Sequence, residues 1–167
     1  MSVIKPNFEG CTPVYLAAYE GHANVVRLLA ICGADVTMPA NDGTTPLFAA
    51  ASRGHRDTVS LLSELGADAT APMVNGATPI FIAAQNGHDE VVKELISLNS
   101  DATAPIFNGV TPIQIAARQR HDRVVGTLLS IGATLPKRRV SEICDKWCMD
   151  EYHGFTPSRH LRMVRRR

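Results

Sequence analysis

The sequence predicts an all-α solenoid, a stack of short helical units that share one pattern. First, the dipeptide Thr-Pro recurs every 33 residues, an internal self-similarity that is typical of repeat proteins. Second, each unit carries the start and stop signals of two short helices. Third, a unit of this size cannot bury its own apolar face, so neighbouring units have to stack to form a continuous core.

Four residue series share this period. The interval of 33 residues separates the Thr-Pro pairs at Thr12, Thr45, Thr78 and Thr111, the glycines Gly10, Gly43, Gly76 and Gly109, the prolines Pro6, Pro39, Pro72 and Pro105, and the histidines His22, His55, His88 and His121. Laid out from Ile4, the period gives four repeats, at residues 4–36, 37–69, 70–102 and 103–135. Residues 1–135 are therefore expected to form a repeat domain, and residues 136–167 a separate C-terminal segment.

Each repeat predicts two helices. Threonine followed by proline is typical of an N-cap and the first helical position, so the first helix begins at Pro13 and ends at about residue 20. Gly21 permits the left-handed conformation that stops this helix. A second helix is expected over about residues 23–32, with one apolar face made by Val25, Val26, Leu28, Leu29 and Cys32. The segment up to the next Thr-Pro is rich in Pro, Asn and Gly, which predicts a turn or a hairpin finger.

The repeat resembles the ankyrin repeat. The shared residues are Gly-x-Thr-Pro, the Ala-Ala pair that follows it, Gly-His, a Val-Val or Thr-Val pair, Leu-Leu or Leu-Ile, and Gly-Ala-Asp. The resemblance implies an ankyrin-repeat solenoid of stacked helix-turn-helix units with hairpin fingers. It also implies a non-catalytic protein-protein interaction module, which binds its partner through the concave face formed by the fingers and the inner helices.

Three departures from the ankyrin pattern bear on packing. Where ankyrin repeats usually have histidine after Thr-Pro-Leu, this sequence has Tyr15, Phe48, Phe81 and Gln114, so we expect aromatic packing in place of a hydrogen bond. Asn99-Ser100 replaces Gly-Ala, and asparagine tolerates the left-handed cap. Arg120 replaces the glycine before His121 and places a side chain in the inner turn of the fourth repeat.

The segment 136–167 predicts a capping helix and a degenerate, partial fifth repeat. An amphipathic helix is indicated by the apolar spacing of Val140, Ile143, Cys144, Trp147 and Cys148. We expect its apolar face to cover the exposed end of the stack. Gly154-Phe155-Thr156-Pro157 then repeats the Gly-x-Thr-Pro signature, as the first helix of a fifth unit would.

Charge is divided unevenly along the chain. Residues 1–135 carry 8 basic and 12 acidic side chains, a net charge of −4, whereas residues 136–167 carry 9 and 4, a net charge of +5. The alternative function is therefore an adaptor whose basic tail binds nucleic acid or anionic lipid, and the tail is also a candidate nuclear-import signal. A further alternative is a regulatory fragment of a larger multidomain enzyme.

Catalysis and cofactor binding are not expected. The sequence has no Gly-x-Ser-x-Gly, Gly-Lys-Ser/Thr or His-Glu-x-x-His motif. The repeated histidines lie one per repeat, too far apart to share a metal ion, so we interpret them as structural. Zinc could be bound by Cys144, Cys148, His153 and His160, but their spacings depart from the usual ones and both cysteines lie on the apolar stripe. This favours packing over a metal site.

Composition is typical of an intracellular, cytoplasmic protein. The sequence has no apolar run long enough to span a bilayer, and its start lacks the apolar region of a secretory signal. Four unevenly placed cysteines fit a reducing compartment better than a disulfide scaffold. We expect a monomer in the cytoplasm, or in the nucleus if the basic tail directs import.

The resemblance also implies which residues face the partner. In ankyrin repeats the variable, solvent-facing positions are the two residues before the finger glycine, the residue after it, and the two residues after Ala-Ala. Here they are Phe8, Glu9, Cys11, Tyr19, Glu20, Asn41, Asp42, Thr44, Ser52, Arg53, Val74, Asn75, Ala77, Gln85, Asn86, Phe107, Asn108, Val110, Arg118 and Gln119. Apolar residues at four of these positions, Phe8, Val74, Phe107 and Val110, indicate a protein interface. The alternative is that the fingers pack sideways on each other.

Overall fold

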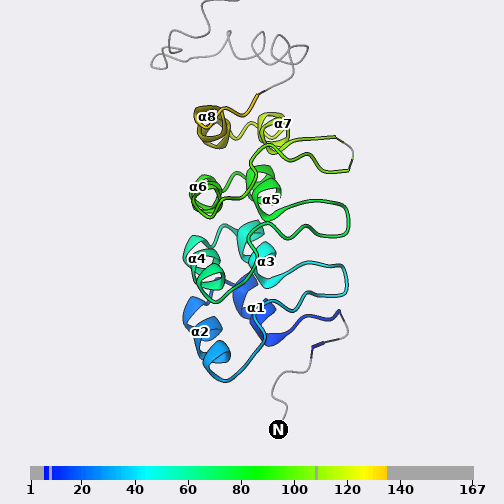
Figure 1. Ribbon diagram of the computed structural model, residues 1–167, viewed down its shortest axis with the longest axis vertical. Coiled ribbons are helices and arrows are strands. Elements are labelled where there is room, and N and C mark those ends of the chain that lie inside the picture. The colour runs from blue at the N-terminus through cyan, green and yellow to red at the C-terminus, as the bar shows by residue number, and fades with distance from the viewer. Residues whose placement is uncertain (1–5, 8, 108, 135–167) are drawn as a thin grey trace, which may run out of the picture. The chain divides into compact units, whose positions relative to one another are not determined.

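The computed structural model describes residues 6–7, 9–107 and 109–134, and these residues form a stack of helix pairs (Figure 1). The inner column consists of α1 (Pro13–Tyr19), α3 (Pro46–Arg53), α5 (Pro79–Asn86) and α7 (Pro112–Arg118), and the outer column of α2 (Ala23–Ile31), α4 (Arg56–Glu64), α6 (Asp89–Ser97) and α8 (Asp122–Ser130). Loops between the pairs extend beyond the inner column as fingers (Figure 1). The described part of the chain contains no strand, so the predicted all-α repeat fold and its helix bounds are confirmed.

The threonines before the inner helices do not all cap in the same way. The backbone N–H of Tyr15 donates to Thr12 Oγ1, and that of Phe48 donates to Thr45 Oγ1, both at 3.1 Å. The hydroxyls of Thr78 and Thr111 are buried and have no hydrogen-bond partner within the described residues. The expected side-chain cap is therefore present at two positions and wrong at the other two, where proline at the first turn still starts the helix.

The turn between inner and outer helices has a left-handed residue in every repeat. Gly54 and Gly87 adopt φ of +82° and +80°, as the sequence predicts. Arg120 adopts φ of +61° at the same place, so the inner turn of the fourth repeat is retained despite its side chain. Asn99 also adopts φ of +61°, which confirms that asparagine replaces glycine at the end of α6.

Alanines and a few large aliphatic residues form the core between the columns. Ala50, Ala51, Ala83 and Ala84 are completely buried where the inner helices contact each other. The largest fully buried side chains are Leu47, Leu62, Ile80, Leu95, Ile113 and Leu128. Phe48 and Phe81 are also buried and pack in one cluster with Ala77, so the expected aromatic packing in place of histidine is confirmed there.

The prediction of one buried apolar face on α2 is wrong in part. Val26 is fully buried, but Val25 and Leu28 are 44% and 60% exposed. These two side chains lie on one side of α2. On the later outer helices, the same side is covered by the preceding repeat. Cys32 is exposed too, because it lies beyond the end of α2, where the chain leaves the stack.

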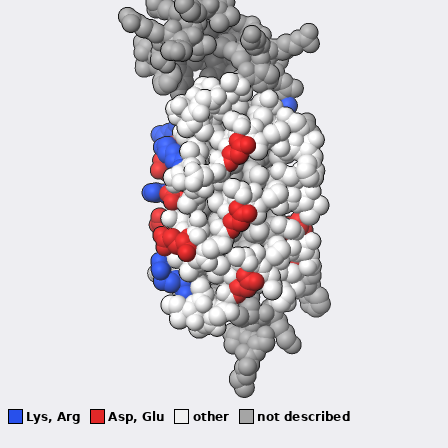
Figure 2. All heavy atoms as spheres, in the orientation of Figure 1, with Lys and Arg blue, Asp and Glu red and all other residues white. Residues whose placement is uncertain are grey.

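Hydrogen-bonded turns follow the outer helices. Asp35, Asp68 and Asp101 each accept hydrogen bonds from the backbone N–H and the hydroxyl of the threonine two residues later, at 2.6–2.8 Å. These bonds lower the pKa of all three carboxyl groups. Figure 2 shows acidic side chains recurring in a column along one face of the stack. These aspartates therefore belong to the turns.

Candidate protein-binding surface

Histidine rings join consecutive inner turns. His55, His88 and His121 place Nε2 at 2.9–3.0 Å from the carbonyl oxygens of Tyr19, Ser52 and Gln85, each in the preceding repeat. Because a carbonyl oxygen only accepts, Nε2 carries the proton in these contacts. The rings thus fix the backbone at the positions that the sequence assigns to partner binding, and the structural interpretation of these histidines is confirmed.

A polar groove runs across the ends of the inner helices. It is open, has a volume of about 440 Å³, and is lined by Ser52, Arg53, Gln85, Asn86, His88, Gln119 and His121. Five of these seven residues belong to the set that follows the Ala-Ala pairs. The structure therefore brings predicted positions from three repeats together along one groove.

Two contacts hold the groove side chains in place. The guanidinium carbon of Arg53 lies 4.9 Å from the centre of the Tyr19 ring, within the range of a cation-π interaction. The Asn86 side-chain amide donates to the carbonyl oxygen of Ser52 at 2.8 Å, so this oxygen accepts from both Asn86 and His88. Arg53, Tyr19 and Asn86 are therefore already restricted in the free chain. Their side chains would lose less conformational entropy when a partner binds.

Large apolar side chains are exposed on the fingers of the third and fourth repeats. Val74 is 73% exposed and Phe107 is 82% exposed. Each also lies against the preceding finger. A Cβ added to Gly76 would be 2.8 Å from Phe107 Cδ1, and one added to Gly43 would be 3.1 Å from Val74 Cγ2. The fingers do pack sideways, as the alternative interpretation expected, but the outer face of each apolar side chain remains in solvent.

The comparison with family models decides the classification of this architecture. The model for ankyrin repeats (3 copies) matches residues 2–73 and 70–139. The chain belongs to the ankyrin repeat family. Ankyrin repeats are in general non-catalytic modules for protein-protein interaction. The comparison with curated proteins finds no match.

The ankyrin stack exposes most of the predicted partner-binding residues. Exposed side chains are those of Glu9, Tyr19, Glu20, Asn41, Asp42, Arg53, Val74, Asn75, Asn86, Phe107, Arg118 and Gln119, and Ser52 and Gln85 are half-buried. Phe8, Asn108 and the predicted C-terminal segment, with its candidate zinc ligands, lie outside the described residues. Among the described residues, no group of three or more His, Cys, Asp or Glu side chains is arranged to hold a metal ion.

The residue after the finger glycine does not face solvent, contrary to the prediction. Cys11, Thr44 and Ala77 are only 8%, 6% and 4% exposed, and Val110 is half-buried against the cluster of Phe48 and Phe81. The cause is a side-chain turn that folds the chain back toward the helices. The backbone N–H groups of these three residues donate to the side-chain oxygens of Asn7, Asp42 and Asn75, at 2.9 Å in each case.

Burial and these turns also shift two pKa values in the fingers. Desolvation raises the pKa of the Cys11 thiol, and the nearby carboxylate of Glu9 raises it further. Hydrogen bonds from the hydroxyl and the backbone N–H of Thr44 lower the pKa of Asp42. Asp42 therefore carries its negative charge at neutral pH on the exposed edge of the second finger.

Two groove residues were not among the predicted positions. His88 and His121 line the groove as well as supporting it. Their place in the sequence offered a signal, since each follows the predicted pair after Ala-Ala by two residues, just across the left-handed turn.

Within the described residues, no helix is long and apolar enough to cross a membrane.

Proposed function

We propose that this chain binds a protein partner through one continuous surface, here called the binding surface. It consists of the polar groove across the inner helices and the exposed side chains of Val74 and Phe107 on the fingers. The observation that carries the proposal is this combination of hydrogen-bonding groups held in fixed positions with large apolar side chains left in solvent. Such an apolar group with a polar rim is typical of protein interfaces.

The shape and chemistry of the groove favour a polypeptide over a small molecule. The groove is open to solvent and lined by hydroxyl, amide, imidazole and guanidinium groups. Small-molecule sites are usually concave, enclosed and mostly apolar. Amide side chains such as Gln85, Asn86 and Gln119 can instead pair with the backbone groups of a polypeptide that lies along the stack.

The remaining parts of the proposal follow from the sequence. We expect the chain to act as a monomer without catalytic activity or cofactor, in the cytoplasm or, if the basic tail directs import, in the nucleus. The net charge of +5 over residues 136–167 supports a second candidate function, an adaptor that binds nucleic acid or anionic lipid. Binding that depends on this tail should weaken steeply with added salt, whereas binding through the apolar fingers should not.

Substitution on the binding surface tests the proposal. The double variant Phe107→Asp with Tyr19→Ala should abolish partner capture from an extract of the source cells, because it removes an exposed apolar anchor and the ring that supports Arg53. The melting curve should change little. Leu65→Asp, at a residue that is 36% exposed beyond the outer helix α4, is the matched control and should retain capture.

Two results would contradict the proposal. Unchanged capture by the folded double variant would place the binding site elsewhere, and loss of capture on removal of residues 136–167 would then favour the basic tail. A large fall in melting temperature on Phe107→Asp alone would show that this ring serves packing, despite its exposure.

A further inference from the structure

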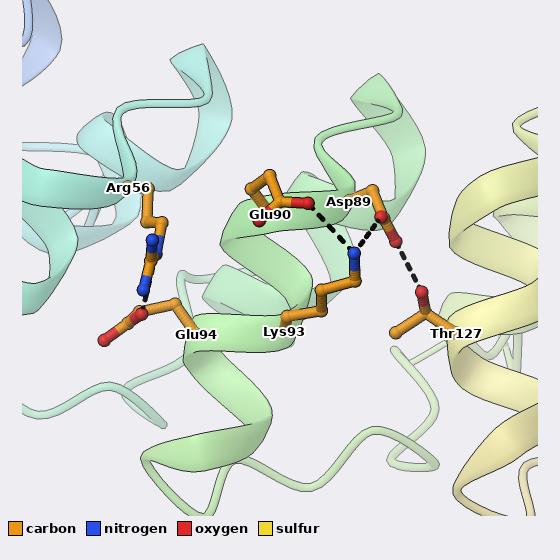
Figure 3. Close-up of polar contacts among 6 residues, drawn as sticks. All are labelled: Arg56, Asp89, Glu90, Lys93, Glu94 and Thr127. Atoms are coloured by element: carbon orange, nitrogen blue, oxygen red, sulfur yellow. Dashed lines mark hydrogen bonds and ion pairs between the residues drawn. The ribbon is translucent and has the colours of Figure 1, made fainter.

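Charged side chains in the middle of the outer column pair with one another (Figure 3). Arg56 Nε of α4 lies 2.9 Å from Glu94 Oε2 of α6. Lys93 Nζ lies 2.7 Å from Asp89 Oδ2 and 2.9 Å from Glu90 Oε1. In the part of the chain that the structure describes, no ion pair includes a residue of the inner helices or the fingers. The charges at the partner-binding positions therefore remain available to a partner.

Three exposed acidic residues, here called the acidic end, lie at partner-binding positions of the first two repeats. Glu9 and Asp42 are on neighbouring fingers, and Glu20 follows α1. The two fingers are in contact, because the backbone N–H of Asn41 donates to the carbonyl oxygen of Glu9 at 3.0 Å. Burial raises the pKa of the Cys11 thiol, and the charges of Glu9 and Asp42 raise it further. Both carboxylates therefore lie near this thiol, so the first two fingers hold two negative charges close together.

The fold does not require the charges of the acidic end. Asp42 accepts a turn hydrogen bond from the backbone N–H of Thr44 at 2.9 Å. One repeat later, Asn75 accepts the equivalent bond from Ala77 with a neutral amide. Glu20 is the C-cap of α1, where a carboxylate meets the negative end of the helix dipole. Charges that neither the turn nor the helix requires indicate a role in binding.

Two exposed arginines, here called the basic end, flank the groove in the fourth repeat. The groove reaches Gln119 and His121, and Arg118 and Arg120 are next to these residues in the sequence. Arg120 adopts φ of +61° at a position where the other repeats have glycine. Arginine rarely adopts this conformation, so the turn carries strain that glycine would avoid. The fourth repeat thus places two cations beside the groove, one of them at a backbone position that disfavours it.

The groove between the two ends is nearly neutral. Of the described residues that line it, Arg53 alone carries a full charge, and its guanidinium lies over the ring of Tyr19. The partner-binding positions of the third repeat carry no charge. Charge along the stack therefore changes from negative at the first repeat to positive at the fourth.

We propose that the binding surface takes an extended segment of another protein, with a basic side chain at one end and an acidic side chain at the other. The basic side chain lies at Glu9, Glu20 and Asp42, and the acidic one at Arg118 and Arg120. Inner helices that pack about 8–10 Å apart place the first and fourth repeats roughly 24–30 Å apart, which about 7–9 extended residues span. This proposal rests on the proposed function and adds the chemistry of the partner.

A nucleic acid does not suit this surface. Its phosphates would meet Arg118 and Arg120 at one end, but the three carboxylates of the acidic end would repel them at the other. A polypeptide segment with acidic residues alone would be repelled in the same way. The basic side chain at the acidic end is therefore as necessary as the acidic side chain at the basic end.

Selection from a random peptide library tests the charge pattern before the partner is identified. The full chain is immobilised and exposed to peptides of about 12 residues displayed on phage, which is longer than the expected span. We expect the enriched sequences to carry Lys or Arg toward one end and Asp or Glu toward the other. The same selection without the chain gives the background frequencies.

Charge reversal at either end should change one half of the pattern. Glu9→Lys with Glu20→Lys should remove the preference for Lys or Arg several-fold and leave the preference for Asp or Glu. Arg118→Glu with Arg120→Gly should do the opposite. Arg27→Glu, at an exposed residue of α2 in the outer column, is the matched control and should enrich the same sequences as the unchanged chain.

Asp42→Asn provides a further variant that keeps the finger intact, because an amide supports the same turn at Asn75. It should weaken the preference for basic residues. Enriched sequences without paired charges, or the same sequences from all variants, would overturn the proposal. An absence of enriched peptides would overturn the extended segment.

Two results separate this proposal from others. Loss of partner capture by Phe107→Asp with Tyr19→Ala, together with peptides that show no charge preference, would retain the proposed function and overturn only the charge pattern. A protease site inserted after Leu135 allows residues 136–167 to be cleaved from the folded chain. Enrichment that appears only after this cleavage would show that the chain's own C-terminal segment occupies the surface, and would overturn the assignment to another protein.

Discussion

His88 Nε2 lies 3.0 Å from the carbonyl oxygen of Ser52, and the same ring occupies the space beside Gly54, where a Cβ would be 2.6 Å from Nδ1. One side chain therefore satisfies a backbone acceptor and fills the gap above a left-handed turn in the preceding repeat. The contact is repeated by His55 with Gly21 and by His121 with Gly87. These rings link neighbouring repeats at the floor of the candidate binding groove.

His88→Ala should destabilise the stack by about 1–3 kcal/mol, because it removes a hydrogen bond and leaves a cavity above Gly54. His22→Ala is the matched control, since His22 holds the same position in the first repeat and is exposed. Its effect should stay within about 0.5 kcal/mol. Urea unfolding measures both variants, and equal effects would show that the contact with Ser52 contributes nothing.

Gly54→Ala should cost more free energy of unfolding than Gly66→Ala. Both residues have positive φ, +82° and +93°, so both variants carry the backbone penalty of about 1 kcal/mol. The new methyl at Gly54 would also meet the ring of His88, whereas the described residues place no such neighbour within 4 Å of the Cβ position at Gly66. Thermal unfolding of the pair measures the difference. Adding His88→Ala to Gly54→Ala should remove the steric part, and a purely additive double variant would contradict this account.

Thr78→Val and Thr45→Val should have opposite consequences. Thr45 Oγ1 accepts the hydrogen bond that caps α3, so its loss should cost about 1 kcal/mol. Thr78 Oγ1 is buried without a partner in the described residues, so its removal should be neutral or stabilising. Chemical denaturation distinguishes the two variants. A large loss of stability in Thr78→Val would show that this hydroxyl has a partner, such as a water molecule.

Acid should destabilise the fold through the turn aspartates. The pKa values of Asp35, Asp68 and Asp101 are lowered by hydrogen bonds from Thr37, Thr70 and Thr103. Because the folded-state pKa lies below the ordinary value of 3.8, the stabilisation is complete above that pH and is lost as the pH falls through the lower, folded-state pKa.

Asp68→Asn tests this pH dependence with a side chain that can still accept the same bonds. The variant should unfold at a lower temperature at pH 7, and the loss of stability below pH 4 should be smaller than in the unchanged chain. Asp57→Asn, at an exposed residue in the first turn of α4, is the control and should leave that pH dependence nearly unchanged. Parallel pH profiles for all three proteins would contradict the role of the turn.

Most of the fold could be predicted because each signal is local and is repeated four times. Thr-Pro, Ala-Ala and the glycine before His55 determine the start, the packing and the end of each inner helix whatever lies elsewhere. The exposure of Leu28 and Cys32 could not be predicted in this way. For Leu28 it depends on position in the stack, since the equivalent Leu61 on α4 is covered by the preceding repeat. Cys32 lies beyond its helix, at a position where Leu65 and Ile131 are exposed as well.

The sequence places the inner-helix side chains of the candidate surface on the side of the stack where the structure has them, but it misplaces part of the fingers. Ser52, Arg53 and Gln85 line the groove because two residues after Ala-Ala always face the same side of a short helix. Thr44 and Ala77 were predicted to be exposed but are buried. Their backbone N–H groups donate to the side chains of Asp42 and Asn75, and this turn directs the residue after the finger glycine toward the helices. The hydroxyl of Thr78, which is buried without a partner among the described residues, could not be predicted from the sequence.

The direction of the histidine contacts has a consequence for synthesis of the chain on the ribosome. Each ring reaches back 36 residues to a carbonyl that leaves the exit tunnel earlier, as His55 does to Tyr19. An inner turn therefore emerges before the side chain that secures it. During translation the newest repeat always remains loose until its successor emerges, so the stack should become rigid from the N-terminal end, one repeat behind elongation.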